Sequence, residues 1–231
     1  MMNKKLFIPF FILLVIAIFF MIKPEKTNGE TKLMEEIKLT PPNWKGKLSL
    51  EEVLSKRRSI RDYKKEEISF EDFSQLLWSL QGITDKLNGL RTAPSAGALY
   101  PLEIYAVVGN VKGLKPGVYK YFPHSHSVKK ILDGDKRKDL ANSALGQESI
   151  IEGAVSFVIT AVYSRTTKKY SQRGERYVMI EVGHAAQNLL LQATALNLGA
   201  VPIGAFYDNK VKSVLKLNEE EPLYIIPVGK K

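Results

Sequence analysis

Residues 177–198 constrain the fold of this chain more than any other part of the sequence. They are enough for about six helical turns and carry apolar side chains on nearly every side. A helix without a polar face must be covered all round. One sheet of the same chain can cover one side, and the simplest cover for the other is a second copy of the chain. These residues therefore predict a long central helix, whose His184 and Asn188 we expect to make core hydrogen bonds and not to bind a metal.

Shorter patterns predict the elements around this helix. Residues 48–56 form an amphipathic pattern in which Ser49 and Glu52 have the spacing of a capping box. Apolar residues recur at helical spacing over residues 69–81, and Gly82 ends that pattern. Runs rich in β-branched and aromatic residues predict strands of one sheet. These runs are residues 102–109, 154–162 and 223–228.

Composition limits the chemistry that this chain can perform by itself. The 231 residues contain 45% apolar and 25% charged side chains, which are values typical of a globular domain. The sequence has no cysteine, which excludes disulfides, thiolate metal sites and a catalytic thiol. The formal net charge is +10, but the lysines are scattered and do not alternate with aromatic residues. We therefore expect attraction to anions and no binding of nucleic acid.

The amino-terminal region predicts attachment to a membrane. An apolar run over residues 6–22 follows Lys4 and Lys5, and no cleavage pattern of small residues follows it. Two interpretations compete, a cleaved signal peptide and an uncleaved anchor. We favour residues 1–22 as an uncleaved membrane anchor, and the lysines before the run favour a domain outside the cytoplasm. Residues 23–47 are polar, contain Pro41 and Pro42, and predict a linker. Residues 48–231 then form the folded domain.

A basic cluster follows the first predicted helix of the domain. Residues 57–63 read Arg-Arg-Ser-Ile-Arg-Asp-Tyr, which places three guanidinium groups and a hydroxyl within five residues. Arginine pairs with phosphate oxygens two at a time and keeps its charge at working pH. The cluster is therefore a candidate receptor for a ligand that carries a phosphate, although such a run can also be a solvated surface.

Four further blocks in the order of the chain extend this cluster into a recognisable pattern. Residues 94–101 read Pro-Ser-Ala-Gly-Ala-Leu-Tyr-Pro, and residues 169–177 lead into the sequence Glu-Val-Gly-His at 181–184. Residues 199–206 read Gly-Ala-Val-Pro-Ile-Gly-Ala-Phe, and residues 222–229 end the series. The chain thus resembles the nitroreductase family of FMN enzymes, and within it the SagB-type dehydrogenases. The resemblance implies an α+β fold of three layers, α/β/α, with a mostly antiparallel central sheet, in a homodimer that holds FMN between its subunits.

The resemblance also implies roles for individual residues. Arg57 and Ser59 match residues that hold the phosphate and ribityl chain, Arg58 is the adjacent basic position, and Arg61 matches a cation near the pyrimidine edge, where reduction places negative charge. The loop of Ser95, Ala96 and Gly97 resembles one that the partner subunit contributes. Ile203, Gly204 and Ala205 resemble the segment that meets flavin N5, although bacterial nitroreductases often have a glutamate where Gly204 stands. Two other residues match positions at the pyrimidine edge and at the basic carboxyl terminus, namely Gln147 and Lys230.

Lys169 and Tyr170 match a pair that similar azoline-oxidising enzymes use to remove a proton while hydride passes to flavin N5. The pair can also belong to a basic patch that only orients the loop. We expect an FMN-dependent oxidoreductase that works by ping-pong two-electron transfer on a small organic substrate, with NAD(P)H as a transient donor. No dinucleotide-binding glycine motif follows a strand. The alternatives are a dehydrogenase that converts peptide azolines to azoles and a membrane-tethered flavin-binding protein without turnover.

Overall fold

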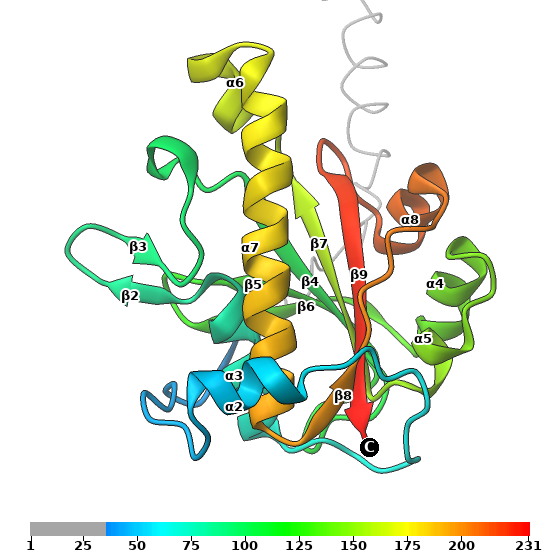
Figure 1. Ribbon diagram of the computed structural model, residues 1–231. Coiled ribbons are helices and arrows are strands. Elements are labelled where there is room, and N and C mark those ends of the chain that lie inside the picture. The colour runs from blue at the N-terminus through cyan, green and yellow to red at the C-terminus, as the bar shows by residue number, and fades with distance from the viewer. Residues whose placement is uncertain (1–35) are drawn as a thin grey trace, which may run out of the picture. The chain divides into compact units, whose positions relative to one another are not determined.

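A central antiparallel sheet organises the part of the chain that the computed structural model describes, residues 36–231 (Figure 1). Within these residues the sheet has seven strands in the order β1-β6-β5-β4-β7-β9-β8, and each neighbouring pair is antiparallel. The predicted strands are confirmed as β4, β7 and β9. The strands are β1 (Glu36–Lys38), β4 (Leu102–Val108), β5 (Gly117–Phe122), β6 (Ser127–Asp133), β7 (Val155–Ala161), β8 (Leu198–Ala200) and β9 (Glu221–Lys230).

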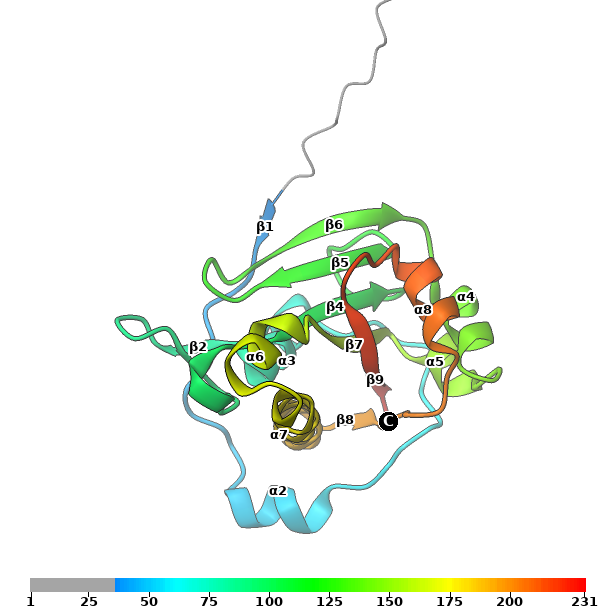
Figure 2. The same cartoon turned by 90° about the horizontal axis from the view of Figure 1, so that it is seen from above.

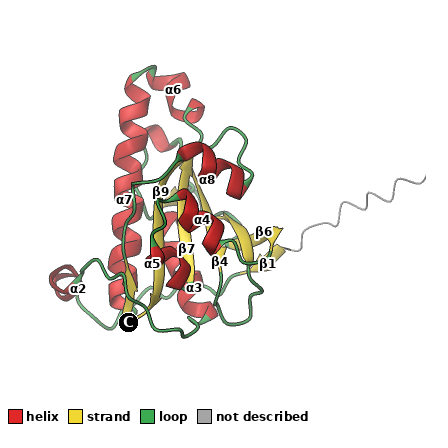
Figure 3. Ribbon diagram, turned by 90° about the vertical axis from the view of Figure 1, so that its right-hand side faces the viewer, coloured by secondary structure: helices red, strands yellow, loops and turns green. Residues whose placement is uncertain are grey.

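Helices cover both faces of this sheet, which confirms the three-layer α/β/α prediction (Figure 3). On one face lie α3 (Phe70–Gln81) and α7 (Arg173–Ala195), and the ring of Phe73 stacks on Phe157 of β7 with ring centroids 6.0 Å apart. On the other face Leu140, Val211 and Ile225 share a second buried cluster. The helices of that face are α4 (Arg137–Ser143), α5 (Glu148–Glu152) and α8 (Asp208–Leu215).

Serine side chains cap the first two helices of the domain, and the capping box at Ser49 and Glu52 confirms its prediction. In α2 (Leu50–Lys56) the Ser49 hydroxyl accepts the Glu52 amide at 3.2 Å, and the Glu52 carboxylate accepts the Ser49 amide at 3.1 Å. The Ser69 hydroxyl caps α3 by accepting the Asp72 amide at 3.0 Å, and Gly82 ends this helix as predicted. These caps satisfy amide groups that the first helical turn leaves without partners. Helix α2 lies on the side of α7 that faces away from the sheet (Figure 2).

One face of α7 is left uncovered by the other described residues, 36–231. Met179 and Ile180 are 53% and 49% exposed, and Gly183, His184 and Gln187 continue the exposed face. The prediction that His184 makes core hydrogen bonds is therefore wrong, because this residue lies on the open face. Asn188 confirms its prediction, since its side chain donates to the Thr92 carbonyl at 3.2 Å.

Part of the predicted linker belongs to the folded domain. Strand β1 pairs with β6, Leu39 is buried, and the Thr40 carbonyl accepts the Ser74 hydroxyl at 2.7 Å. The linker prediction is thus wrong for residues 36–40, because a three-residue edge strand gives no periodic signal in the sequence. The predicted anchor, residues 1–22, lies outside the described residues. Among residues 36–231, no helix is both long and apolar enough to span a bilayer.

Candidate functional site

The basic cluster at Arg57–Arg61 is held against the edge of the sheet by backbone hydrogen bonds. The Ile60 amide donates to the Ala200 carbonyl at 3.0 Å, and the Lys64 amide donates to the Lys230 carbonyl at 2.9 Å. Ser59 pairs with Ala200 in a parallel bridge. The cluster therefore has a fixed position beside β8 and the end of β9. It directly follows α2, in agreement with the predicted helix over residues 48–56.

The buried side chain of Tyr63 holds the segment of the basic cluster against β9. Its hydroxyl donates to the carbonyls of Ile60 at 2.8 Å and Pro227 at 3.1 Å, and burial raises the pKa of the phenol. Its ring packs so closely on Gly199 and Gly229 that a methyl group on either glycine would lie within 3.1 Å of it. Side chains larger than hydrogen at these two positions would displace the ring. The close packing explains why two glycines stand opposite each other in β8 and β9.

The guanidinium groups of this cluster are available to an anion. Arg57 is half-buried, and Arg58 and Arg61 are exposed. Arg58 donates to the carbonyls of Ser55 and Arg57, whereas within residues 36–231 the side chains of Arg57 and Arg61 make no hydrogen bond or ion pair. Two unpaired guanidinium groups beside an exposed serine hydroxyl fit a phosphate group.

The segment with Ile203, Gly204 and Ala205 lies farther along the same strand edge. Ile203 exchanges two backbone hydrogen bonds with Ile225, at 2.8 and 3.0 Å. Gly204 and Ala205 are exposed, and a methyl group on Gly204 would have no neighbour closer than 3.8 Å. The backbone here can be approached by a flat ligand, and Gly204 is not required by packing within one subunit.

Gln147 and Lys230 lie near the two ends of this region. Gln147 stands directly before α5. The Tyr207 amide, two residues after Ala205, donates to the carbonyl of Ser143 at the end of α4 at 2.9 Å. The Lys230 ammonium lies 3.8 Å from the Asp72 carboxylate. The structure thus gathers most of the predicted cofactor residues along the edge formed by β8 and β9.

A second group joins the predicted loop to the predicted catalytic pair. Gly97 has a φ of +64° in the short 3₁₀ turn η1 (Ala96–Ala98). A methyl group on it would lie 2.7 Å from the Tyr170 hydroxyl and 3.0 Å from the Lys169 ammonium. Both partners come from α6 (Ser164–Tyr170), and Lys169 is exposed. The structure therefore brings the Ser95–Gly97 loop against Lys169 and Tyr170.

Arg165 fixes α6 on the sheet. Its guanidinium lies 2.5 Å from the Glu103 carboxylate of β4 and donates to the Tyr100 carbonyl at 3.2 Å. The ring of Tyr170 meets that of Tyr177 edge to face with centroids 5.2 Å apart. The pair is thus held by contacts on both sides.

A buried polar cluster beneath the loop was not predicted from the sequence. Glu181 of α7 is only 3% exposed, and burial raises the pKa of its carboxyl from the usual 4.5 to about 7, against smaller opposing effects of Ser95, Arg91 and Gln81. Arg91 comes from the hairpin of β2 (Ile83–Asp85) and β3 (Leu90–Arg91) and donates to Gln81 at 3.0 Å. In the sequence, the position of Glu181 within the apolar run of residues 177–198 was the signal that could have indicated this cluster.

The two groups of predicted residues lie at opposite ends of α7. Figure 1 shows α6 at one end of this helix and β8 with α2 at the other. The 23 residues of α7 span about 34 Å. In the described chain, residues 36–231, the basic cluster and the Lys169–Tyr170 pair therefore do not form one site.

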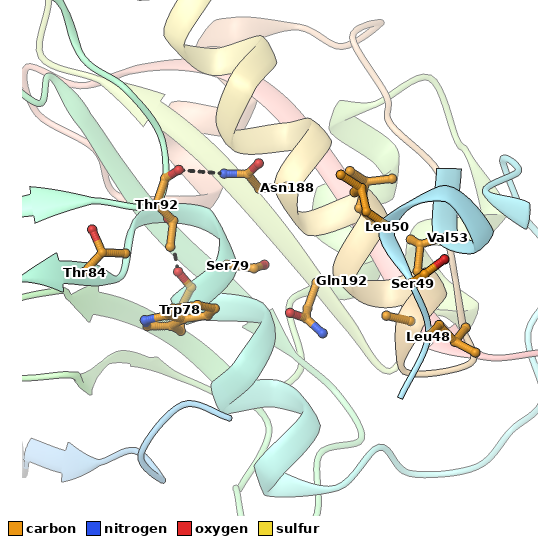
Figure 4. Close-up of a pocket in the computed structure, with 12 residues that line it drawn as sticks. Leu48, Ser49, Leu50, Val53, Trp78, Ser79, Thr84, Thr92, Asn188 and Gln192 are labelled. Atoms are coloured by element: carbon orange, nitrogen blue, oxygen red, sulfur yellow. Dashed lines mark hydrogen bonds between the residues drawn. The ribbon is translucent and has the colours of Figure 1, made fainter. Parts of the chain in front are cut away.

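A groove of about 490 Å³ lies between α2, α3 and α7 (Figure 4). Leu50 and Val53 line one wall, Trp78 lines the other, and Asn188 and Gln192 of α7 lie between them. None of the predicted site residues lines this groove.

The antiparallel sheet between two helical layers, with a basic cluster at its β8–β9 edge, defines a nitroreductase-like α+β protein. Residues 54–230 match the nitroreductase family, and the chain belongs to this family of oxidoreductases. It is 48% identical over 184 residues to a nitroreductase-family protein of Methanocaldococcus jannaschii, which covers 80% of this chain and 92% of that protein.

Two further relatives are more distant in sequence. A solved nitroreductase-family structure from Anabaena variabilis is 32% identical with a TM-score of 0.75, and the match covers 86% of this chain and 42% of that one. The microcin B17-processing protein McbC of Escherichia coli is 26% identical over 161 residues, which is 67% of this chain and 59% of that protein.

Proposed function

We propose that this protein is an FMN-dependent oxidoreductase that works as a homodimer. The observation that carries the proposal is the separation of its two predicted groups along α7. If two copies pair their α7 helices in opposite directions, the basic cluster of one subunit comes near the Ser95–Gly97 loop of the other. Each of two equivalent sites would then contain residues from both chains.

The uncovered face of α7 supports this pairing. Met179 and Ile180 stand out from a helix whose other sides pack on the sheet and on α3. Exposed neighbouring apolar side chains on a long helix are typical of an interface between subunits. A second copy would cover them and would complete the site at the same time.

Different residues of the chain would bind different parts of FMN. Arg57, Arg58 and Ser59 would hold the phosphate and ribityl chain, and Arg61 would place a positive charge at the pyrimidine edge. The exposed backbone of Gly204 and Ala205 would approach the ring system. Bound FMN would supply two-electron hydride chemistry at N5. Lys230 and Gln147 would add polar contacts at the periphery.

We propose a small quinone, nitroaromatic or unsaturated compound as the acceptor, with NAD(P)H as the donor. Both would visit the same open face in turn. Purified protein should be yellow, should bleach on addition of NAD(P)H, and should regain its colour with a quinone. A colour that does not bleach with any donor would favour the flavin-binding protein without turnover. Colourless protein that does not take up added FMN would contradict the proposal.

Oxidation of a peptide azoline is a second candidate. The similarity to McbC and the contact of Lys169 and Tyr170 with Gly97 favour it. Lys169, with Tyr170 beside it, would remove the ring proton while hydride leaves for FMN, so that the substrate loses two hydrogens. Mass spectrometry of a model azoline peptide incubated with the protein and an electron acceptor tests this function. An unchanged mass would remove it.

A change on α7 tests the dimer. We expect Ile180→Arg to yield monomers on size-exclusion chromatography with light scattering and to lose FMN at the same protein concentration. Ile151→Arg, at a partly exposed position on α5, is the matched control and should leave both properties unchanged. Monomers that retain FMN would show that one subunit completes the site alone.

We further propose that residues 1–22 anchor this domain to a membrane, with the domain outside the cytoplasm. The proposal depends on the apolar run and the lysines before it. Recovery of the full-length protein in the soluble fraction would contradict it.

A further inference from the structure

Arg165 contacts both parts of the site that the Ser95–Gly97 loop forms with the Lys169–Tyr170 pair. It belongs to α6 and stands one helical turn before the pair. Its Nη1 donates to the carbonyl of Tyr100, just beyond the loop, at 3.2 Å. Its Nη2 lies 2.5 Å from Glu103 Oε1 in β4. One guanidinium group therefore joins the helix that carries the pair to the loop that faces it.

The Glu103 carboxylate is itself held by a second cation. Its Oε2 lies 3.2 Å from the Lys120 ammonium of β5, which also lies 3.2 Å from Glu220 Oε1. The Tyr105 hydroxyl donates to the same Glu220 oxygen at 2.9 Å. The side chains of Glu103, Lys120 and Glu220 are only 16%, 23% and 12% exposed. Together with Arg165 they form a chain of alternating charges, and largely buried charges that are paired in this way have few other arrangements open to them.

The backbone just beyond the loop has an unfavourable conformation that side-chain contacts must offset. Ala98 and Tyr100 have φ values of +54° and +45°, in the left-handed region that residues other than glycine rarely adopt. The Tyr100 amide donates to the Ser95 hydroxyl at 2.9 Å. The Arg91 guanidinium lies over the Tyr100 ring, with its carbon 4.4 Å from the ring centroid. Because Arg165 binds the carbonyl, the amide, the ring and the carbonyl of Tyr100 each have a partner.

Helix α6 depends on such contacts because it is short. It has seven residues, and the residue before it, Tyr163, makes no capping hydrogen bond with its side chain. Helices shorter than about twelve residues are unstable alone in water. Farther along α6, the backbone of Thr167 packs on Gly174 of α7, where a methyl group would lie 2.9 Å from Thr167 Cα. Arg165 adds an ion pair and a hydrogen bond at the first turn of the helix.

We propose that Arg165 is a positioning residue that sets the Ser95–Gly97 loop against the Lys169–Tyr170 pair, and that Glu103 orients its guanidinium. The loop and the pair are in direct contact, so that a shift of α6 moves the pair relative to the loop. Misplacement of a reacting group by about 1 Å can slow a reaction about a hundredfold. The effect on catalysis rests on the proposed function, in which Lys169 removes a proton while hydride passes to FMN. The effect on the position of the two segments does not.

Hydrogen exchange in flavin-free, full-length protein tests the positioning role without any activity. Arg165→Ala should speed exchange about three- to tenfold in peptides that cover residues 94–100 and 164–171, because one ion pair and one hydrogen bond are lost. Peptides of α4, residues 137–143, should not change. Lys168→Ala removes an exposed cation from the same helix and should match wild type. Wild-type exchange of either segment in Arg165→Ala, or an equal increase in α4, would overturn the proposal.

Two further variants test the partners of Arg165 and keep the test decisive if Arg165→Ala does not fold. Arg165→Lys keeps the charge but replaces a planar pair of nitrogens by one, so that it should restore only part of the protection. Full protection would show that charge alone is needed and would contradict the role of the guanidinium. Glu103→Gln should loosen the same two segments, while Lys120 keeps its pairing with Glu220. Combined with Arg165→Ala it should add nothing, and additive effects would show that Glu103 does not act through Arg165.

Flavin reduction separates this inference from the proposed function. Stopped-flow measurements at saturating FMN compare reduction by a model azoline peptide, which needs a base, with reduction by NAD(P)H, which does not. Arg165→Ala should lower the ratio of the two rates about tenfold, and should have no further effect on it in a Lys169→Ala background. An equal loss with both donors would contradict the positioning role. Segments that loosen as expected in protein that neither donor reduces would contradict the proposed function and support the positioning role.

Discussion

Gly97 and Tyr170 are in direct contact, so that the glycine has no room for a side chain beneath the tyrosine hydroxyl. We expect Gly97→Ala to destabilise the fold by about 1–2 kcal/mol from its left-handed backbone alone, and to displace Tyr170 and Lys169 in addition. Gly113→Ala is a matched control, because Gly113 has a φ of +79° and open space around it. Chemical denaturation measures both, and equal losses of stability would show that the contact with Tyr170 is easily relieved.

Replacement of the half-buried arginine in the basic cluster should weaken FMN binding. One charge-assisted bond to phosphate contributes about 1.5–3 kcal/mol, so that Arg57→Ala should raise the dissociation constant about ten- to a hundredfold. Fluorescence titration of flavin-free protein measures the change. Lys138→Ala removes an exposed positive charge on α4 and should have no effect. Equal affinities of Arg57→Ala and wild type would remove Arg57 from the phosphate site.

The Lys169–Tyr170 pair should affect turnover and not binding. Lys169→Ala should slow oxidation of a C–H substrate by about a hundredfold or more while FMN affinity stays the same. Lys168→Ala, an exposed neighbour on the same helix, is the control. Stopped-flow measurement of flavin reduction by the substrate follows the step directly. Unchanged rates in Lys169→Ala would leave the pair with a structural role.

Glu181 should make the stability of the protein depend on pH. Because its pKa is raised in the folded state, the folded state binds more protons than the unfolded state between about pH 4.5 and 7. The contribution of this group to stability should therefore be fully present below pH 4.5 and be lost as pH rises through 7, by about 3 kcal/mol. Glu181→Gln should remove that decline and be more stable than wild type at pH 8. Parallel stability curves of the two proteins would show that Glu181 has an ordinary pKa.

The sequence predicted the parts of the fold that depend on local patterns. The capping box of Ser49 and Glu52, the helix end at Gly82 and the strands β4, β7 and β9 follow from neighbouring residues, and the structure confirms them. It also joins Ser59 to Ala200, which belongs to the same sequence block as the predicted site residues Ile203, Gly204 and Ala205.

The features that local patterns missed depend on distant contacts. Strand β1 is only three residues long and is defined by its pairing with β6. The open face of α7 includes the apolar residues Met179 and Ile180, so that periodicity alone did not separate it from the buried faces. Glu181 gains its environment from Gln81 and Arg91, which lie about a hundred residues earlier in the chain. Local sequence patterns cannot predict contacts between residues that are so far apart in the chain.

The position of β1 has a consequence for how this domain can be attached to other structures. It forms one border of the sheet, and the basic cluster lies beside the opposite border, next to β8. Whatever is joined ahead of Glu36, whether a lipid bilayer, an affinity tag or a fused protein, connects at the border farthest from the cluster. Immobilisation through that end should leave the basic cluster open to diffusing molecules.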